Sequence, residues 1–249
     1  MNKRFLFLLL LIPLLLMLPL LLAAAPSKSL VISVAKDSYV VADFNDPGDR
    51  EGLRERNLGS LDFVKTWYAW KILRDEKAAS FVYLNFDLSP LKGKKVEEAA
   101  LQLYARKVET NSANFVAAHF VRGDWSELTI NFNNRPPFDP EPIIVVPIYG
   151  GQGWYTWEVT DVLAKEVERG VTEFSVALML VDMVEGNEEQ VIFNSKEAGD
   201  SIPRLVVVYG GTSLLPLGWI LTLGGVVLVA SGIVFLWRRK LVLISRGRG

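Results

Sequence analysis

The sequence predicts an all-β protein: an antiparallel β-sandwich with one short crossover helix, an N-terminal signal segment and one C-terminal transmembrane helix. Three observations support this: uncharged segments at both ends of the chain, apolar side chains alternating with a period of two between them, and turn-forming residues between the alternating segments. The predicted boundaries are a signal peptide at 1–26, a β-rich ectodomain at 27–209, a linker at 210–213, a transmembrane helix at 214–237 and a basic cytoplasmic tail at 238–249.

The N-terminal segment has the layout of a secretory signal. Lys3 and Arg4 precede an uncharged, leucine-rich run at 5–25 that ends in three alanines. A basic start, an apolar run and small residues at its end are the three parts of a signal peptide. An uncleaved N-terminal span is the alternative, because the run reaches the length of about 20 residues that crosses a bilayer. Pro13 and Pro19 argue against a straight retained helix.

The C-terminal segment is predicted to span the membrane. Residues 214–237 contain no charged side chain, and at about 1.5 Å per residue they would cross a hydrocarbon core of about 30 Å. The basic run 238–240 follows directly, with no acidic residue after it. The positive-inside rule then places the tail in the cytoplasm and the middle of the chain outside the cell. We therefore expect a single-pass cell-membrane protein, with the lipid bilayer as a partner.

Composition limits the other partners. Cysteine is absent, so the exported domain must be held together by its hydrophobic core rather than by disulfides. All 28 acidic residues lie at 27–213, with 20 of the 27 basic ones, so this part of the chain has a net charge of −8. A negative domain repels the phosphate backbone, so nucleic acid is not expected as a partner.

Strands are predicted from alternation. In the segment 79–88, Val82, Leu84 and Phe86 share one face, and Tyr83 lies on the other. This period of two is typical of a half-buried strand. The other predicted strands are 30–35, 39–42, 99–106, 115–121, 143–148, 154–159, 174–181, 190–194 and 204–209. About ten short strands separated by turns predict a two-sheet antiparallel sandwich.

One helix is predicted after the strand at 154–159. Thr160 can cap its N-terminus, Leu163 and Val167 form an apolar stripe, and Gly170 can end it in a left-handed conformation. We interpret this helix as a crossover between sheet edges.

Several short motifs follow one another in a characteristic order along the predicted domain. They are Leu84–Ser89 followed by Ala100–Tyr104; Asp124–Glu127 with Thr129, Asn133, Asn134 and Pro136; Trp157–Val162; and Phe193–Glu197 with Pro203–Val207. In this order they resemble the DNRLRE family, which is also classed among carbohydrate-binding modules. The resemblance implies a jelly-roll β-sandwich, found mostly in secreted or surface-attached prokaryotic proteins as a binding or adhesive accessory module. The stretch 43–73 departs from the family pattern.

The residues give little support for catalysis. His119 is the only histidine, and neither a nucleophile motif nor a metal-ligand spacing surrounds it. We therefore expect a structural role for His119 and a protein that is not an enzyme. A glycosidase with paired carboxylates stays open as an alternative, because acidic residues are plentiful and their geometry is unknown at this point.

One acidic turn is a candidate calcium site. Calcium prefers six to eight oxygen ligands, and oxygen-bearing side chains crowd this turn. They are Asp43, Asn45, Asp46, Asp49 and Glu51. A solvated acidic turn without an ion is the alternative. Glu197 and Asp200 form a second, weaker candidate.

Aromatic side chains mark the predicted ligand site. Sugar faces stack on exposed rings, and Trp67, Tyr68 and Trp70 lie within four residues of one another. In an extended segment Tyr68 and Trp70 share one face and Trp67 takes the other, so packing of two of the rings in the core is the alternative. The tryptophans at 125, 154 and 157 are assigned to sandwich packing.

The function predicted from these observations is a non-catalytic cell-surface binding or adhesion module. Its expected ligand is a polysaccharide or a neighbouring cell-envelope protein, bound by loops on a rigid sandwich. A structural envelope subunit that assembles with copies of itself is the second hypothesis. A polysaccharide-degrading enzyme is the third.

Overall fold

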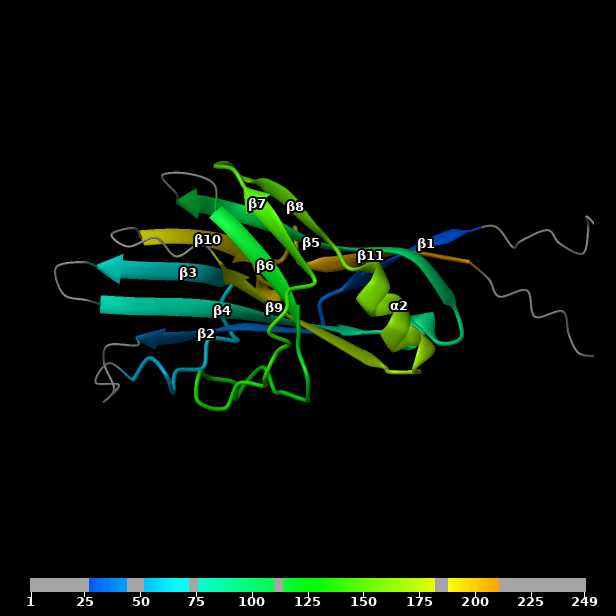
Figure 1. The fold of residues 1–249 in the computed structure, drawn as a ribbon, viewed down its shortest axis with the longest axis horizontal. Helices are drawn as coiled ribbons and strands as arrows, with labels where there is room; N and C mark the ends of the chain where they lie inside the picture. The colour runs from blue at the N-terminus through cyan, green and yellow to red at the C-terminus, as the bar shows by residue number, and fades with distance from the viewer. Residues whose placement is uncertain (1–26, 44–51, 72–75, 110–113, 182–187, 211–249) are drawn as a thin grey trace, which may run out of the picture. The chain divides into compact units, whose positions relative to one another are not determined.

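The computed structural model describes residues 27–43, 52–71, 76–109, 114–181 and 188–210 (Figure 1). The strands are β1 Lys28–Ser33, β2 Lys36–Asp43, β3 Phe63–Lys71, β4 Glu76–Asp87, β5 Lys95–Glu109, β6 Asn114–Phe120, β7 Ile144–Ile148, β8 Gly153–Glu158, β9 Glu173–Leu180, β10 Glu188–Asn194 and β11 Arg204–Gly210. The helix α2 spans Thr160–Glu168, and the short 3-10 turns η2 and η3 span Ser89–Leu91 and Lys196–Ala198.

All strand pairs are antiparallel, and they form one curled sheet in the order β1-β11-β5-β10-β3-β4-β9-β6-β7. In addition, β2 pairs with β4 and β8 pairs with β5. Figure 1 shows β10, β3, β4 and β2 running side by side. The register shifts in β10 and β11 where they face β5, and such bulges bend a sheet. This architecture is consistent with the predicted jelly-roll-like β-sandwich.

The core lies inside the curl. Along β5 burial alternates, so Leu101, Leu103 and Ala105 are buried and Tyr104 faces outward. Trp157 is fully buried, and its indole nitrogen donates to the Val116 carbonyl oxygen at 3.0 Å. A buried indole that has both apolar contacts and a hydrogen-bond acceptor fits the core without leaving a polar group unsatisfied.

The ten predicted strands are all present, and the structure adds one strand that was not predicted, β3. Its core-facing positions are Val64, Thr66 and Tyr68, and Thr66 is fully buried although it is polar. A polar residue in the inward series breaks the apolar alternation that identifies a strand. The strand forms because β10 and β4 pair with its two edges.

The predicted helix is confirmed, with two corrections. It does not join two sheet edges, because the strand that follows it, β9, lies between β4 and β6. α2 leads from β8 at the sheet edge to β9, buries Leu163 and Val167, and is followed by Gly170 at φ 76°. Thr160 does not cap the helix. Its hydroxyl accepts a hydrogen bond from the Ala99 backbone nitrogen at 2.7 Å, so it joins the helix to β5 instead.

The predicted signal segment 1–26 and the predicted transmembrane helix 214–237 lie outside the described residues. Within the described ranges, no helix combines the length and hydrophobicity needed to cross a membrane.

Candidate functional site

The predicted aromatic trio lies on β3 but does not form one exposed surface. Tyr68 is only 4% exposed and belongs to the core. This agrees for Tyr68 with the alternative that some of the rings pack in the core. Trp67 is half-buried, its indole nitrogen donates to Glu188 Oε1 at 3.1 Å, and Lys65 Nζ lies 4.9 Å from its ring centroid. Trp70 lies on β3, and its side chain is outside the described part. Sugar binding by Trp67 and Trp70 stays a prediction.

The predicted calcium turn is not described. Asp43 is the last residue of β2, and its side chain and the following residues lie outside the described part. A calcium ion held by Asp43, Asn45, Asp46, Asp49 and Glu51 therefore stays a prediction.

A different carboxylate cluster is present in the folded domain. Carboxylate oxygens of Asp37, Glu127 and Glu197 lie within 4.8 Å of one another. Lys196 Nζ lies among them, 2.6 Å from Glu127 Oε2 and 3.4 Å from Glu197 Oε1. The Lys196 backbone nitrogen also donates to Asp37 Oδ2 at 2.7 Å, and the Asp37 backbone nitrogen donates to Glu127 Oε1 at 2.8 Å.

The carboxylate cluster links separate parts of the domain. Burial raises the pKa of Asp37 from 3.8 to about 7, and the repulsion of Glu197 and Glu127 acts in the same direction. The hydrogen bond with Glu127 raises the pKa of Lys196, so its ammonium group stays charged. Because Lys196 supplies positive charge beside the acids, the donor set fits an ion-pair network better than a divalent cation. It ties the start of β2 to η3 and to the loop after β6.

His119 has the structural role that the sequence predicts. It is 5% exposed on β6, and its Nδ1 lies 2.8 Å from the Asp139 carbonyl oxygen. Its ring packs 5.2 Å from the ring of Phe138.

The prediction that three tryptophans pack inside the sandwich is wrong for one of them. Trp125 and Trp157 are buried, at 9% and 0% exposure, but Trp154 is 39% exposed. The reason is the period of β8: residues three apart on a strand lie on opposite faces. Since Trp157 faces the core, Trp154 must face out. This parity is visible in the sequence and identifies Trp154 as a surface aromatic.

Trp154 is part of an aromatic platform, which consists of Tyr104, Trp154 and Arg204. Tyr104 on β5 lies directly opposite Trp154 on β8, and their rings meet edge to face at a centroid distance of 5.7 Å. The Arg204 guanidinium carbon lies 4.1 Å from the Trp154 ring centroid. Because β8 and β11 flank β5, this contact reaches across β5.

Polar groups surround the platform on the same face of the sheet. Arg204 Nε donates to Gln102 Oε1 at 3.0 Å, and the exposed Thr156 is opposite Gln102 on β8. In the described part of the chain Arg204 makes no ion pair with a carboxylate. The surface thus combines an aromatic ring with guanidinium, amide and hydroxyl groups. This is the chemistry that a sugar ring requires, because a sugar has apolar C–H faces and hydroxyl groups at its edge.

The family model of carbohydrate-binding module family 96 matches residues 33–209, which includes the whole platform. The comparison with curated proteins found no match. The family match agrees with the resemblance to carbohydrate-binding modules that the sequence motifs show.

Proposed function

Because this chain belongs to carbohydrate-binding module family 96, we propose that it binds a polysaccharide without cleaving it, and that the aromatic platform is its contact surface. Carbohydrate-binding modules are generally non-catalytic. The observation that supports this platform most is that the 39% exposed Trp154 ring lies beside the guanidinium group of Arg204, which combines an aromatic surface with hydrogen-bond donors.

The platform can contribute binding energy in two ways. The exposed part of the Trp154 ring can contact the C–H face of a sugar, and an aromatic contact of this kind is worth about 0.5–1.5 kcal/mol. Arg204 and Gln102 can then donate hydrogen bonds to hydroxyl groups at the edge of the same ring. The hydrogen bond between Arg204 and Gln102 and the contact of Arg204 with Trp154 restrict the rotamers of these side chains before the ligand arrives, which lowers the entropy cost of binding.

Polysaccharide pull-down with the full chain tests this proposal. Trp154→Ala should weaken binding about tenfold, which corresponds to about 1.4 kcal/mol. Leu128→Ala is the matched control, because Leu128 is a large apolar side chain that is 71% exposed away from the platform. Equal binding by the two variants would show that the platform is not the contact surface. Release of reducing ends from the bound polysaccharide would contradict a non-catalytic role.

We further propose that the module acts at the cell surface, tethered by the apolar segment 214–237. The apolar segment and the basic run 238–240 support this proposal. In this arrangement the module would attach the cell to a polysaccharide. Protease treatment of intact cells is the test: the β-rich domain should be digested and the basic tail protected. Protection of the domain would contradict the proposed location.

A further inference from the structure

The start of β1 and the end of β11 lie side by side in the sheet (Figure 1). Lys28 of β1 pairs with Tyr209 of β11, and the next residue, Gly210, pairs with Lys95 at the start of β5. The apolar segment 214–237 begins four residues after Gly210. An extended chain covers at most about 14 Å over this distance. The end of β11 is therefore the part of the domain that is tied most closely to the apolar segment.

Lysine side chains surround the end of β11. Lys28, Lys92 and Lys95 are exposed, and Lys94 is half-buried. The ammonium nitrogen of Lys94 lies 4.1 Å from the ring centroid of Tyr209, whose cross-strand partner is Lys28. We call Lys28, Lys92, Lys94, Lys95 and Tyr209 the lysine end of the domain. Its members come from β1, from the turn and strand start at 92–95 and from β11, so only the fold brings them together.

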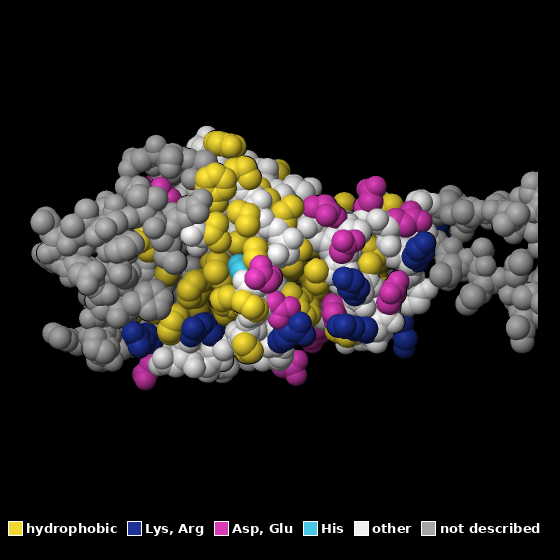
Figure 2. Space-filling model, in the orientation of Figure 1, with side chains coloured by type: hydrophobic (Ala, Val, Ile, Leu, Met, Phe, Trp, Pro, Cys, Tyr) yellow, Lys and Arg dark blue, Asp and Glu magenta, His cyan; other side chains and the backbone are white. Residues whose placement is uncertain are grey.

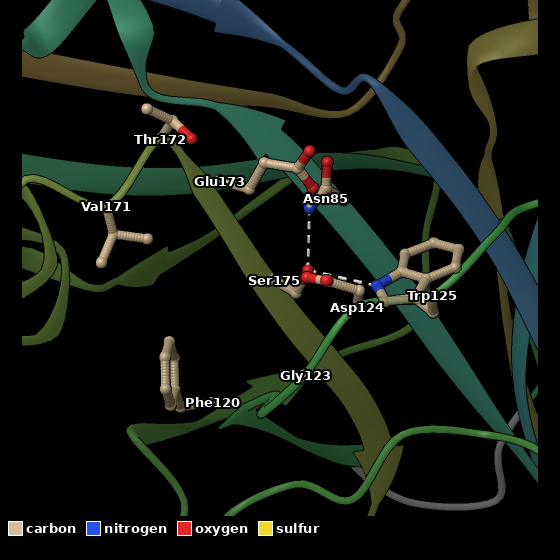
Figure 3. A pocket seen from close by; sticks show the side chains of 9 residues that line it. All are labelled: Asn85, Phe120, Gly123, Asp124, Trp125, Val171, Thr172, Glu173 and Ser175. Carbon is tan, nitrogen blue, oxygen red and sulfur yellow. Dashed lines mark hydrogen bonds between the residues drawn. The ribbon is translucent and has the colours of Figure 1, made fainter.

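The ammonium groups of the lysine end are not neutralised by the domain. Elsewhere a lysine is held by a carboxylate: Lys36 pairs with Glu173 at 2.9 Å. Figure 3 shows this Glu173 beside Asn85, which donates to the same carboxylate at 3.0 Å and to Ser175 Oγ at 2.9 Å. Among the described residues, no carboxylate forms an ion pair with any of the four lysines of the lysine end. These four charges remain able to attract an external anion.

The surroundings of the lysine end are mixed in charge. Glu97 and Glu98 follow on β5, and Glu97 accepts a hydrogen bond from Ser27 Oγ at 2.6 Å. The four lysines exceed these two acids by two charges. Figure 2 shows charged side chains of both signs around α2, whereas hydrophobic side chains cover β6 and β7. Because the segment 27–213 is negative as a whole, it can approach an anionic surface only with a locally positive part facing that surface.

In the proposed tethered arrangement, the lysine end comes within reach of lipid headgroups. The headgroup layer takes about 5–8 Å on each side of the hydrocarbon core. A connection of at most about 14 Å then leaves at most about 9 Å between Gly210 and the headgroups. This is close to the Debye length of about 8 Å at physiological salt, so the attraction between lysines and anionic lipids is only partly screened. A tyrosine ring such as that of Tyr209 is also favoured at a membrane–water interface.

We propose that the lysine end docks on the headgroups of anionic lipids and fixes the orientation of the domain on the membrane. This inference rests on the proposed membrane tether and adds a partner surface to it. Tyr104 of the aromatic platform lies nine residues beyond Lys95 on β5, a distance of about 30 Å along the strand. Docking through the lysine end therefore keeps the platform away from the bilayer, where a polysaccharide can reach it.

Energy transfer to labelled lipid headgroups tests the inference on the full chain in nanodiscs. Cysteine is absent from the chain, so Ser29→Cys, at an exposed position of β1, carries a single fluorophore beside Lys28. Energy transfer should be higher in nanodiscs that contain phosphatidylglycerol than in phosphatidylcholine alone. Salt at about 1 M, where the Debye length is about 3 Å, should remove the difference. About 1 kcal/mol for each lysine corresponds to a factor of about five in the docking equilibrium.

Charge reversal identifies the side chains that are responsible. Replacing both Lys92→Glu and Lys95→Glu should reduce the energy transfer in anionic nanodiscs to the level in neutral ones. Both side chains are exposed, so the fold should be kept. Lys165→Glu is the matched control, because Lys165 is an exposed lysine on α2, and it should leave the lipid dependence unchanged. Equal energy transfer in the two lipids, or no effect of the double reversal, would overturn the inference.

The same samples separate this inference from the other proposals. A chain that does not co-elute with either nanodisc contradicts the tether and the docking together, whereas co-elution without lipid dependence contradicts the docking alone. Trp154→Ala should not change the energy transfer, and the double reversal should keep the polysaccharide pull-down. Loss of the pull-down with unchanged energy transfer would assign Lys92 and Lys95 to polysaccharide binding, and the inference would be wrong.

Discussion

Replacing Asp37 by Asn should stabilise the domain at pH 8 and leave its stability nearly unchanged at pH 4. Asp37 is 1% exposed, and burial raises its pKa from 3.8 to about 7. Asn has the same shape, and its side-chain oxygen can still accept the hydrogen bond from the Lys196 backbone nitrogen. Its amide group can donate to the carboxylates of Glu127 or Glu197, which repel an ionised Asp37.

Proton linkage gives the sign and the size of the expected difference in unfolding free energy between the two proteins. Between pH 4 and 7 the folded state binds the Asp37 proton more tightly than the unfolded state does, so Asp37 costs stability as the pH rises through this window. A pKa that rises from 3.8 to about 7 corresponds to at most about 4 kcal/mol, at about 1.4 kcal/mol for each tenfold step. The Asn variant lacks this loss. We therefore expect its advantage to grow from near zero at pH 4 to between about 1 and 4 kcal/mol at pH 8.

Urea unfolding followed by tryptophan fluorescence measures this difference at several pH values. Only the difference between the two proteins is needed, so the titration of all other groups largely cancels. Glu98→Gln is the control, because Glu98 is an exposed acid on β5, and its effect should be small at every pH. If Asp37→Asn is less stable than the unchanged protein at pH 8, then Asp37 is ionised and stabilised by Lys196, and the reasoning is wrong.

Two further predictions concern packing. Trp157→Ala should destabilise the domain by about 3–5 kcal/mol because it empties a fully buried site, whereas Trp154→Ala should cost less than about 1 kcal/mol, and urea midpoints of the two variants compare them directly. Gly59→Ala should cost about 1–3 kcal/mol, because a Cβ atom there would lie 2.8 Å from Glu127 Cγ and still closer to the Glu127 carbonyl oxygen. Gly150→Ala has open space around it and should change the melting temperature little; equal shifts for the two glycines would contradict the steric argument.

Local patterns predict the strands of this protein well. Alternation along β4 and β5 depends only on neighbouring residues, so it can be identified before the partner strands are known. β3 is the exception, since the polar Thr66 occupies a core-facing position and interrupts the apolar alternation, and the strand forms through its pairing with β10 and β4. The same local alternation shows that Trp154 and Trp157 lie on opposite faces of β8, so only one of them can pack in the core.

The ion-pair cluster could not be predicted in this way. Asp37 meets Lys196 across 159 residues and Glu127 across 90. The motif at 124–127 and the segment at 193–197 resemble family motifs, but the sequence does not show that their charged side chains meet each other. Nor does it show that the half-buried Glu127 contacts Lys196 and Asp37.

Amino-acid order alone establishes where this chain is apolar, where it alternates and where it turns, because each of these is a property of a few consecutive residues. It therefore defines the predicted membrane segments and most of the strands. Which outward-facing side chains become neighbours depends on strand pairing over long distances. Arg204 reaches Trp154 only because β11 and β8 both pair with β5, and Asn85 meets Ser175 only because β4 pairs with β9. The proposed aromatic platform is a product of that pairing.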